Sequence, residues 1–230
     1  KRLLSLSRHW HAVNMPARSP VPAAAGAIHL STASILATLT PDEITAGSDT
    51  SVRLMMAAAD AFAELGFHAT TTRDIASRAG LSSAGVYVHF SSKEELLFQV
   101  SRRGHLTARD LLRNAADTAA TPSDALRAII GGFARWHAEH HQLGRIVQFE
   151  FRHLSPEHRE DVRELRRAID QVVAQVLEDG VESGEFEVDD IRGTALALLS
   201  MAVDVARWYT PGIRRTPEEI EQSYADLALR

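Results

Sequence analysis

Residues 66–97 read GFHATTTRDIASRAGLSSAGVYVHFSSKEELL, and this stretch decides the fold. Thr71 carries a hydroxyl that can cap one short helix. Gly80 then breaks the chain, and Ser82 can cap a second short helix that ends near Phe90. Two short helices joined by a tight turn predict a helix-turn-helix, in which the second helix enters the major groove of DNA while the first braces it.

The sequence on both sides of this stretch is also helical in pattern. Apolar residues recur at helical spacing over residues 52–65, and Gly66 is expected to end that segment. Ser92-Lys93-Glu94-Glu95 is a capping box that opens a long helix from Leu96 to about Asp117. Three later helices share one start signal, a hydroxyl residue before a proline at the first helical position: Thr121-Pro122, Ser155-Pro156 and Thr216-Pro217.

These patterns predict about nine helices and no sheet, so the fold class is all-α. We divide the chain into a flexible N-terminal extension (residues 1–47), a three-helix DNA-binding domain with the helix-turn-helix (48–97), and a C-terminal helical ligand-binding and dimerisation domain (98–230). Residues 1–47 lack an apolar period and are rich in proline, so they bury too little surface to offset the entropy of ordering. A targeting peptide is the alternative interpretation of this segment.

The predicted recognition helix begins with small residues, which let its backbone approach a groove closely. Hydroxyls and backbone N–H groups at a helix N-terminus can bind phosphate. The larger side chains nearby can extend toward phosphate or sugar, although each could equally serve packing alone. The candidate DNA-binding residues are Thr71, Thr72, Arg73, Ser82, Ser83, Ala84, Gly85, Tyr87, His89 and Lys93.

The net charge of −5 argues against a nucleic-acid partner only until the charges are placed along the chain. Residues 48–104 hold six Lys and Arg and six acidic residues, so the predicted DNA-binding region is neutral. Residues 105–230 hold 15 basic and 22 acidic residues, and they carry the negative charge. We therefore expect a DNA complex with a modest salt dependence, in which few phosphates are neutralised per subunit.

Composition excludes several other classes of protein. The chain has no cysteine, which removes disulfides, thiolate metal sites and a cysteine nucleophile. No apolar stretch is long enough to predict a transmembrane helix. Residues 105–230 show no catalytic constellation, so we predict that the chain is not an enzyme and needs no cofactor.

The C-terminal region offers aromatic and basic residues that can line a pocket between helices. The candidate ligand-binding residues are Trp136, Phe149, His153, Met201, Val205, Arg207 and Trp208. Two alternatives stay open. His137 and His141 are four residues apart and could bind a metal from one helix face, which would make the effector a metal ion. The second alternative is a helical enzyme that acts on acyl thioesters with a histidine base beside Glu150. The sequence offers no nucleophile next to such a base.

Residues 51–97 resemble the N-terminal signature of the TetR family of one-component transcriptional regulators. The match runs through five groups of residues: Thr70-Thr71, Arg73-Asp74-Ile75-Ala76, Ala79-Gly80-Leu81-Ser82, Val86-Tyr87 with His89-Phe90, and Lys93-Glu94 with Leu96. The resemblance implies a non-catalytic homodimer on a palindromic double-stranded DNA operator, with recognition helices about 34 to 36 Å apart. It also implies a bacterial, cytoplasmic protein whose C-terminal domain binds a small organic effector.

A second resemblance covers residues 206–224. This stretch is similar to TetR-type regulators of lipid and steroid-ring breakdown, which sense CoA thioesters, so it implies an acyl-CoA effector. Arg207 and Trp208 would then bind the anion and the planar group of that ligand. Dimerisation is expected through two apolar stripes on the last two helices: Ile191, Ala195, Leu198, Leu199 and Ala202, and Ile220, Tyr224 and Leu227.

Overall fold

The computed structural model describes residues 35 and 48–230, and the regular structure in this part of the chain is helical throughout. The predicted all-α class is therefore confirmed for the described residues. In order, the elements are α2 (Ser48–Ala69), α3 (Thr72–Arg78), α4 (Ser83–His89), α5 (Lys93–Thr118), α6 (Pro122–Glu139), α7 (His141–Phe149), the 3₁₀ helix η2 (Glu150–His153), α8 (Pro156–Ser183), α9 (Ile191–Trp208) and α10 (Pro217–Leu227).

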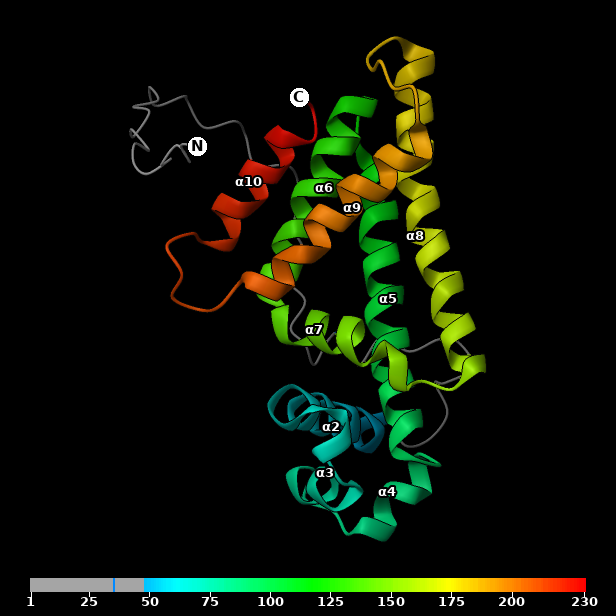
Figure 1. The fold of residues 1–230 in the computed structure, drawn as a ribbon, viewed down its shortest axis with the longest axis vertical. Helices are drawn as coiled ribbons and strands as arrows, with labels where there is room; N and C mark the ends of the chain where they lie inside the picture. The colour runs from blue at the N-terminus through cyan, green and yellow to red at the C-terminus, as the bar shows by residue number, and fades with distance from the viewer. Residues whose placement is uncertain (1–34, 36–47) are drawn as a thin grey trace, which may run out of the picture.

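The helices form a small N-terminal unit (α2–α4) and a larger C-terminal bundle (α6–α10), as Figure 1 shows. The long helix α5 starts beside the N-terminal unit and runs up into the bundle, and α7 lies across the junction between the two. The expected domain boundary after residue 97 falls inside α5. Within residues 48–230, no helix is both long and apolar enough to cross a membrane.

Local start signals place the helix ends where the sequence predicts them. The hydroxyl oxygens of Thr121, Ser155 and Thr216 each accept a hydrogen bond from the third backbone N–H of α6, α8 and α10. Ser92 caps α5 in the same way, accepting from the N–H of Glu95 at 3.0 Å. The predicted capping box at this site is only half formed, because the Glu95 carboxylate accepts from the Gln99 amide instead.

Two helix breaks shape the chain. Gly66 ends the regular helix that starts at Ser48, as the sequence predicts, with φ of 76° and ψ of 164°, a conformation that glycine adopts at little cost; a short helical turn follows it within α2. The second break is at His140, with φ of −113° and ψ of 35°, which separates α6 from α7. The sequence there contains neither glycine nor proline, so no local signal predicted it.

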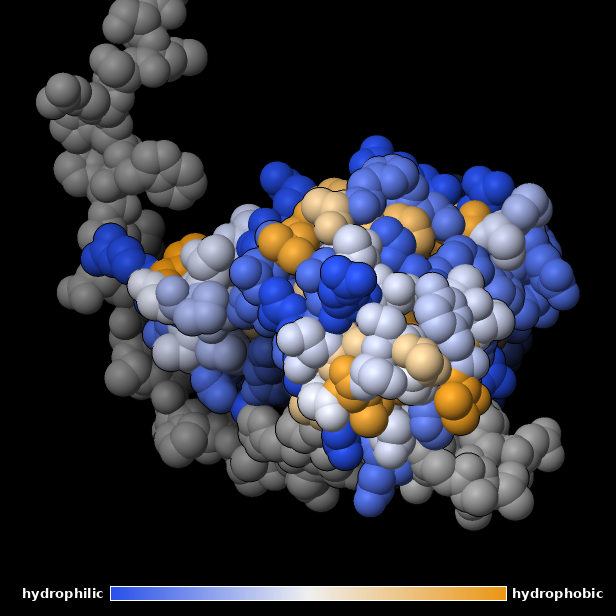
Figure 2. Space-filling model, turned by 90° about the horizontal axis from the view of Figure 1, so that it is seen from below, coloured by the Kyte–Doolittle hydropathy of each residue, from blue (hydrophilic) through white to orange (hydrophobic). Residues whose placement is uncertain are grey.

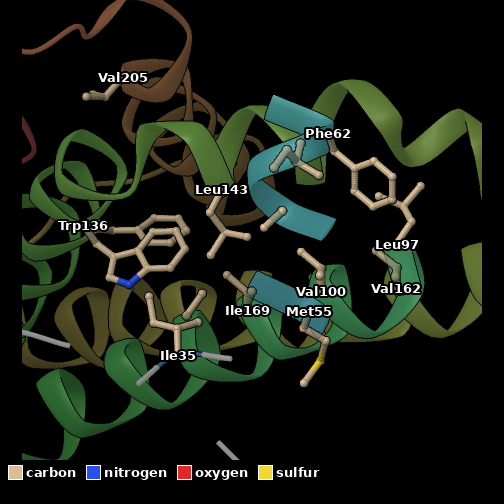
Figure 3. Packing of buried hydrophobic residues seen from close by; sticks show 14 of the residues in the cluster. Ile35, Met55, Phe62, Leu97, Val100, Trp136, Leu143, Val162, Ile169 and Val205 are labelled. Carbon is tan, nitrogen blue, oxygen red and sulfur yellow. The ribbon is translucent and has the colours of Figure 1, made fainter. Parts of the chain in front are cut away.

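One continuous hydrophobic core links the N-terminal unit to the bundle. Figure 3 shows Phe62 of α2 and Leu97 of α5 in this cluster, together with Trp136 of α6. Ile35 is fully buried in the same cluster, so at this position the predicted extension packs on the core instead of being flexible. The rest of the prediction for residues 1–47 lies outside the described residues.

The stripes expected to form the dimer interface pack largely inside the subunit. Ala195, Leu199 and Ala202 of α9 are buried in the subunit core, and so is Ile220 of α10. α10 approaches α6 closely at Gly131, where a Cβ atom would lie 2.9 Å from the Glu221 carbonyl oxygen. The buried residues of these stripes cannot meet a second subunit, so within α9 and α10 we expect exposed side chains such as Leu196 and Leu227 to make the contact between subunits.

Candidate DNA-binding and effector sites

The first helix of the predicted motif is fixed by a reciprocal cap. Thr71 Oγ1 accepts from the backbone N–H of Asp74 at 3.2 Å, and the Asp74 carboxylate accepts from the Thr71 N–H at 2.8 Å and from its hydroxyl at 2.7 Å. These hydrogen bonds to the charged form lower the pKa of Asp74. The start of α3 is therefore locally determined.

The turn between α3 and α4 is stabilised from outside the motif. Gly80 adopts a positive φ of 67°, which glycine tolerates. Arg53 of α2 donates from Nη2 to the Ala79 carbonyl oxygen at 2.6 Å, and Ser82 caps α4 through the N–H of Gly85. Six apolar side chains between the two helices are buried or partly buried: Ile75, Ala76, Ala79, Leu81, Val86 and Phe90.

The predicted DNA-binding side chains lie together at the free end of the molecule. Thr71, Arg73, Ser82, Ala84 and Tyr87 are exposed, and Thr72, Ser83, Gly85, His89 and Lys93 are half-buried. The Tyr87 hydroxyl lies 3.3 Å from Thr72 Oγ1, which joins the two helices at this surface. Figure 2 views this end of the molecule from below and shows hydrophobic patches among hydrophilic side chains.

Two of these residues also make contacts within the protein. Lys93 donates from Nζ to the carbonyl oxygens of Phe67 at 2.6 Å and Thr70 at 2.7 Å, and it lies 4.3 Å from the Phe67 ring centroid. Burial lowers the pKa of Lys93. His89 Nδ1 lies 3.3 Å from the Ser51 hydroxyl. Lys93 therefore stabilises the chain after the Gly66 kink, while its proposed phosphate contact stays a prediction.

The C-terminal bundle encloses a cavity of about 380 Å³ between α5, α6, α7, α8 and α9. This volume lies within the range of small-molecule sites. Its apolar wall includes Phe133, Trp136, Ile169 and Leu199, and its polar side chains include His105, His137, Gln148, Arg166, Asp170 and Ser200. Such a mixed, partly enclosed site can hold an apolar ligand with a few polar atoms.

Family models match both regions. Residues 54–100 match the model described as bacterial regulatory proteins of the tetR family, and residues 119–230 match the tetracyclin repressor-like C-terminal domain. The HTH-type transcriptional repressor KstR2 of Mycobacterium tuberculosis is 33% identical over 183 residues, which is 76% of this chain and 89% of that protein. The chain belongs to the TetR family.

Solved structures of TetR-family proteins share this fold. A regulatory protein of the family from Rhodococcus RHA1 is 35% identical with a TM-score of 0.76, over 80% of this chain and 97% of that one. The KstR2 structure is 29% identical with a TM-score of 0.71, over 80% and 95% of the two chains. AibR, solved with isovaleryl coenzyme A and operator DNA, has a TM-score of 0.71 at 21% identity, over 77% of this chain and 97% of that one, and shows the fold alone. This TetR-family chain is a transcriptional repressor that binds DNA, and the family is not a class of enzymes.

Only one of the seven candidate ligand residues lines the cavity of this TetR-family protein. Trp136 does so, whereas the other six lie outside its lining. Phe149 is exposed at the end of α7, Val205 is fully buried, and Met201 packs against the core. Their helical spacing was compatible with a cavity wall, but the rotation of α7 and α9 directs them elsewhere.

The remaining three candidate ligand-binding residues have other partners. Arg207 is exposed and pairs with Asp204 at 2.6 Å. Trp208 packs against the core beside Tyr209 at the end of α9. His153 lies at the junction with the N-terminal unit, where its ring stacks on Phe67 at 5.1 Å. Nothing in these contacts connects the three side chains to the cavity.

The two histidines of the cavity are buried and neutral. His105 Nδ1 donates to the Ser101 carbonyl oxygen at 2.8 Å, while its Nε2 accepts from Arg166 Nε at 3.2 Å, which fixes the tautomer. His137 Nδ1 donates to the Phe133 carbonyl oxygen at 2.9 Å. Burial is the main reason that the pKa of each of these histidines falls to about 4.

His105, Arg166 and Asp170 line the cavity although the sequence did not predict them there. A signal for Arg166 is present in the sequence of α8, because Val162 and Ile169 on the same helix face are both buried. A charged residue within such an apolar stripe is rare and calls for a partner. Its partner His105 lies 61 positions away on α5, and sequence spacing cannot show that contact.

The metal-binding alternative has no support in the described residues. The helix break at His140 places His137 on α6 and His141 on α7, so the two do not share one helix face. His137 faces the cavity, whereas His141 packs beside Tyr209, with ring centroids 5.5 Å apart. Within residues 35 and 48–230, no group of three His, Asp or Glu side chains could hold a metal ion.

The roles of Lys93 and Arg73 can be separated by matched substitutions. Lys93→Met should lower the free energy of unfolding by about 1–2 kcal/mol, because two backbone carbonyls lose a charged donor in a partly solvated site. Arg73→Met, at an exposed side chain, should leave stability within about 0.5 kcal/mol. It should instead lower operator affinity and reduce the salt slope by about one. Denaturant unfolding measures the stability of each variant, and anisotropy titrations at several salt concentrations measure its operator affinity. A stability loss in Arg73→Met without one in Lys93→Met would contradict these roles.

The buried histidines should make stability fall in mild acid. Below about pH 6.5 the unfolded chain binds a proton at His105 and at His137, whereas the folded chain does not until about pH 4. The free energy of unfolding should therefore decrease as pH falls across this window, by up to about 1.4 kcal/mol per pH unit for each histidine. Replacing His105 or His137 with Gln should flatten the slope in urea unfolding measured from pH 7 to 4.5, and an unchanged slope would contradict this cause.

Proposed function

We propose that the protein is a ligand-released repressor. It binds a palindromic operator as a homodimer, and a small organic effector, an acyl-CoA of lipid or steroid catabolism, releases it from DNA. The observation that carries this proposal is the cavity of about 380 Å³, because α5 forms part of its wall and also begins at the N-terminal unit. A cytoplasmic location, where operator DNA is found, follows from the same proposal.

The contacts at the junction support α5 and the start of α8 as the coupling elements. Gly104, His105 and Ala108 of α5 line the cavity. At the start of the same helix, the Glu94 carboxylate accepts from the Ser155 N–H at 2.8 Å and from His158 Nδ1 at 2.9 Å. A ligand that favours another position of α5 would change the spacing of the two recognition helices, and operator affinity would drop by the coupling free energy.

The similar proteins support the class of effector. The solved AibR complex contains isovaleryl coenzyme A, and FadR of Bacillus subtilis was solved with stearoyl-CoA. KstR2 is described as a ketosteroid transcriptional regulator. The cavity fits the acyl part of such a ligand, since its apolar wall suits a hydrocarbon and its volume is at the lower end of the range for ligand sites.

The proposal is tested with DNA fragments recovered by selection against the purified full chain. We expect a palindromic site bound by two subunits, measured by sedimentation, and release of that site by at least one of isovaleryl-CoA, decanoyl-CoA and stearoyl-CoA in an anisotropy assay. Free coenzyme A is the control for binding of the nucleotide part alone. Operator binding that none of these acyl-CoAs changes would overturn the proposed class of effector.

A further inference from the structure

The cavity holds one group of polar side chains in contact with one another. Arg166 and Asp170 come from α8 and His105 from α5, and Arg166 donates to His105. Aromatic and aliphatic side chains of α6 and α9, among them Phe133 and Leu199, form much of the remaining wall, with His137, Gln148 and Ser200 between them. A ligand that fills this cavity therefore meets a largely apolar surface and a cation where α5 and α8 meet.

Arg166 supplies that cation, and its donors are only partly used. Nε donates to His105 Nε2 at 3.2 Å, and Nη2 makes a long contact of 3.4 Å to the Val147 carbonyl oxygen. Among residues 48–230, no carboxylate lies within ion-pair distance of its guanidinium, unlike the neighbouring Arg163 and Arg167, which both pair with Glu160. A half-buried guanidinium without a carboxylate partner gains most from a ligand that brings an oxygen acceptor.

Two other titratable groups of the cavity act on Arg166, and neither forms an ion pair with it. His105 accepts from Arg166 and is held in one neutral tautomer, so it adds no positive charge. Asp170 is half-buried, and burial raises its pKa while Arg166 opposes that shift. The guanidinium also lies over the Phe151 ring of η2, 4.4 Å from the centroid, which holds its plane in place.

We propose that Arg166 binds the oxygen acceptor of the effector's acyl group, a carboxylate or a thioester carbonyl, in the cavity where α5 and α8 meet. The inference rests on the proposed function, because it names the group through which that effector is held. The guanidinium donates two hydrogen bonds to one acceptor group, and this selects acyl compounds over hydrocarbons and alcohols of the same chain length.

Calorimetric titration of the full chain with decanoate, decanoyl-CoA and decanol tests this assignment. The wild type should bind decanoate or decanoyl-CoA at least tenfold more tightly than decanol, and Arg166→Met should lose that preference, a 10- to 100-fold loss for the acyl probe with decanol binding unchanged. Arg166→Lys should keep part of the preference, since lysine retains the positive charge but cannot donate two parallel hydrogen bonds as a guanidinium does. Arg167→Met, one position along on the exposed face of α8, is the matched control and should bind like the wild type.

The outcomes separate the inference from the function on which it rests. Undiminished binding of the acyl probe by a folded Arg166→Met protein, or equal binding of all three probes by the wild type, would overturn the role of Arg166. If decanoyl-CoA still released the Arg166→Met protein from its operator, the proposed function would remain supported. A wild type that binds no acyl probe and stays on its operator with all of them would overturn the proposed function and the inference with it. Loss of affinity for decanoate rather than for decanoyl-CoA would identify a free carboxylate as the group that Arg166 binds.

Discussion

Leu196→Arg is expected to convert the protein to a monomer and to lower its affinity for the full operator by roughly 10²–10⁴-fold. Leu196 lies on α9 at the edge of the cavity and is 60% exposed, more than any other large apolar side chain of α9 or α10. The neighbouring apolar positions of α9 pack inside the subunit, so Leu196 is the strongest candidate there for a contact between copies. A two-fold axis brings each substituted residue to the same interface, where a buried charge without a partner is costly.

The size of this effect follows from bivalent binding. A dimer holds two recognition helices on one operator, and losing the second removes the advantage of effective concentration. Sedimentation velocity and anisotropy on a full operator and on a half-site separate the two consequences. Val181→Arg, the same change at an exposed apolar residue on the last turns of α8, is the control and should stay dimeric. A Leu196→Arg protein that remains dimeric would move the interface away from this part of α9.

The helix-turn-helix could be predicted because its signals are local. The Thr71 and Ser82 caps, the positive φ of Gly80 and the burial of Val86 all depend on residues within a few positions of one another. Each of these features persists in any packing that forms the motif. The contacts of its exposed side chains with DNA stay predictions.

The cavity could not be predicted in the same way, because its wall depends on the rotation of helices far apart in the sequence. No glycine or proline in the sequence predicts the break at His140, and this break determines the direction of α7. The contact of Arg166 with His105 and the burial of Val205 arise only when α5, α8 and α9 pack together. Apolar spacing shows that such residues face inward, but it does not distinguish a cavity wall from a filled core.

Ala108→Phe should produce a repressor that binds its operator normally and no longer responds to acyl-CoA. Ala108 is a buried residue of α5 whose side chain lines the cavity, so a phenyl ring there would occupy much of the space of about 380 Å³. Effector affinity should fall by at least about 100-fold, since ligand and ring compete for one volume in a close-packed interior. The cost in stability should be about 1–3 kcal/mol, the range for overpacking.

The control for this substitution lies on the same helix. Ala116 of α5 is directed to a different hollow, lined by Arg113, Pro122 and Gln175, so Ala116→Phe should keep the response to the acyl-CoA that releases the wild type. Anisotropy titration of the operator complex with that acyl-CoA compares the three proteins directly. A response retained in Ala108→Phe and lost in Ala116→Phe would place the effector in the second hollow. A response retained in both variants would exclude the two hollows as effector sites. A response lost in Ala108→Phe alone places the effector between α5 and α9.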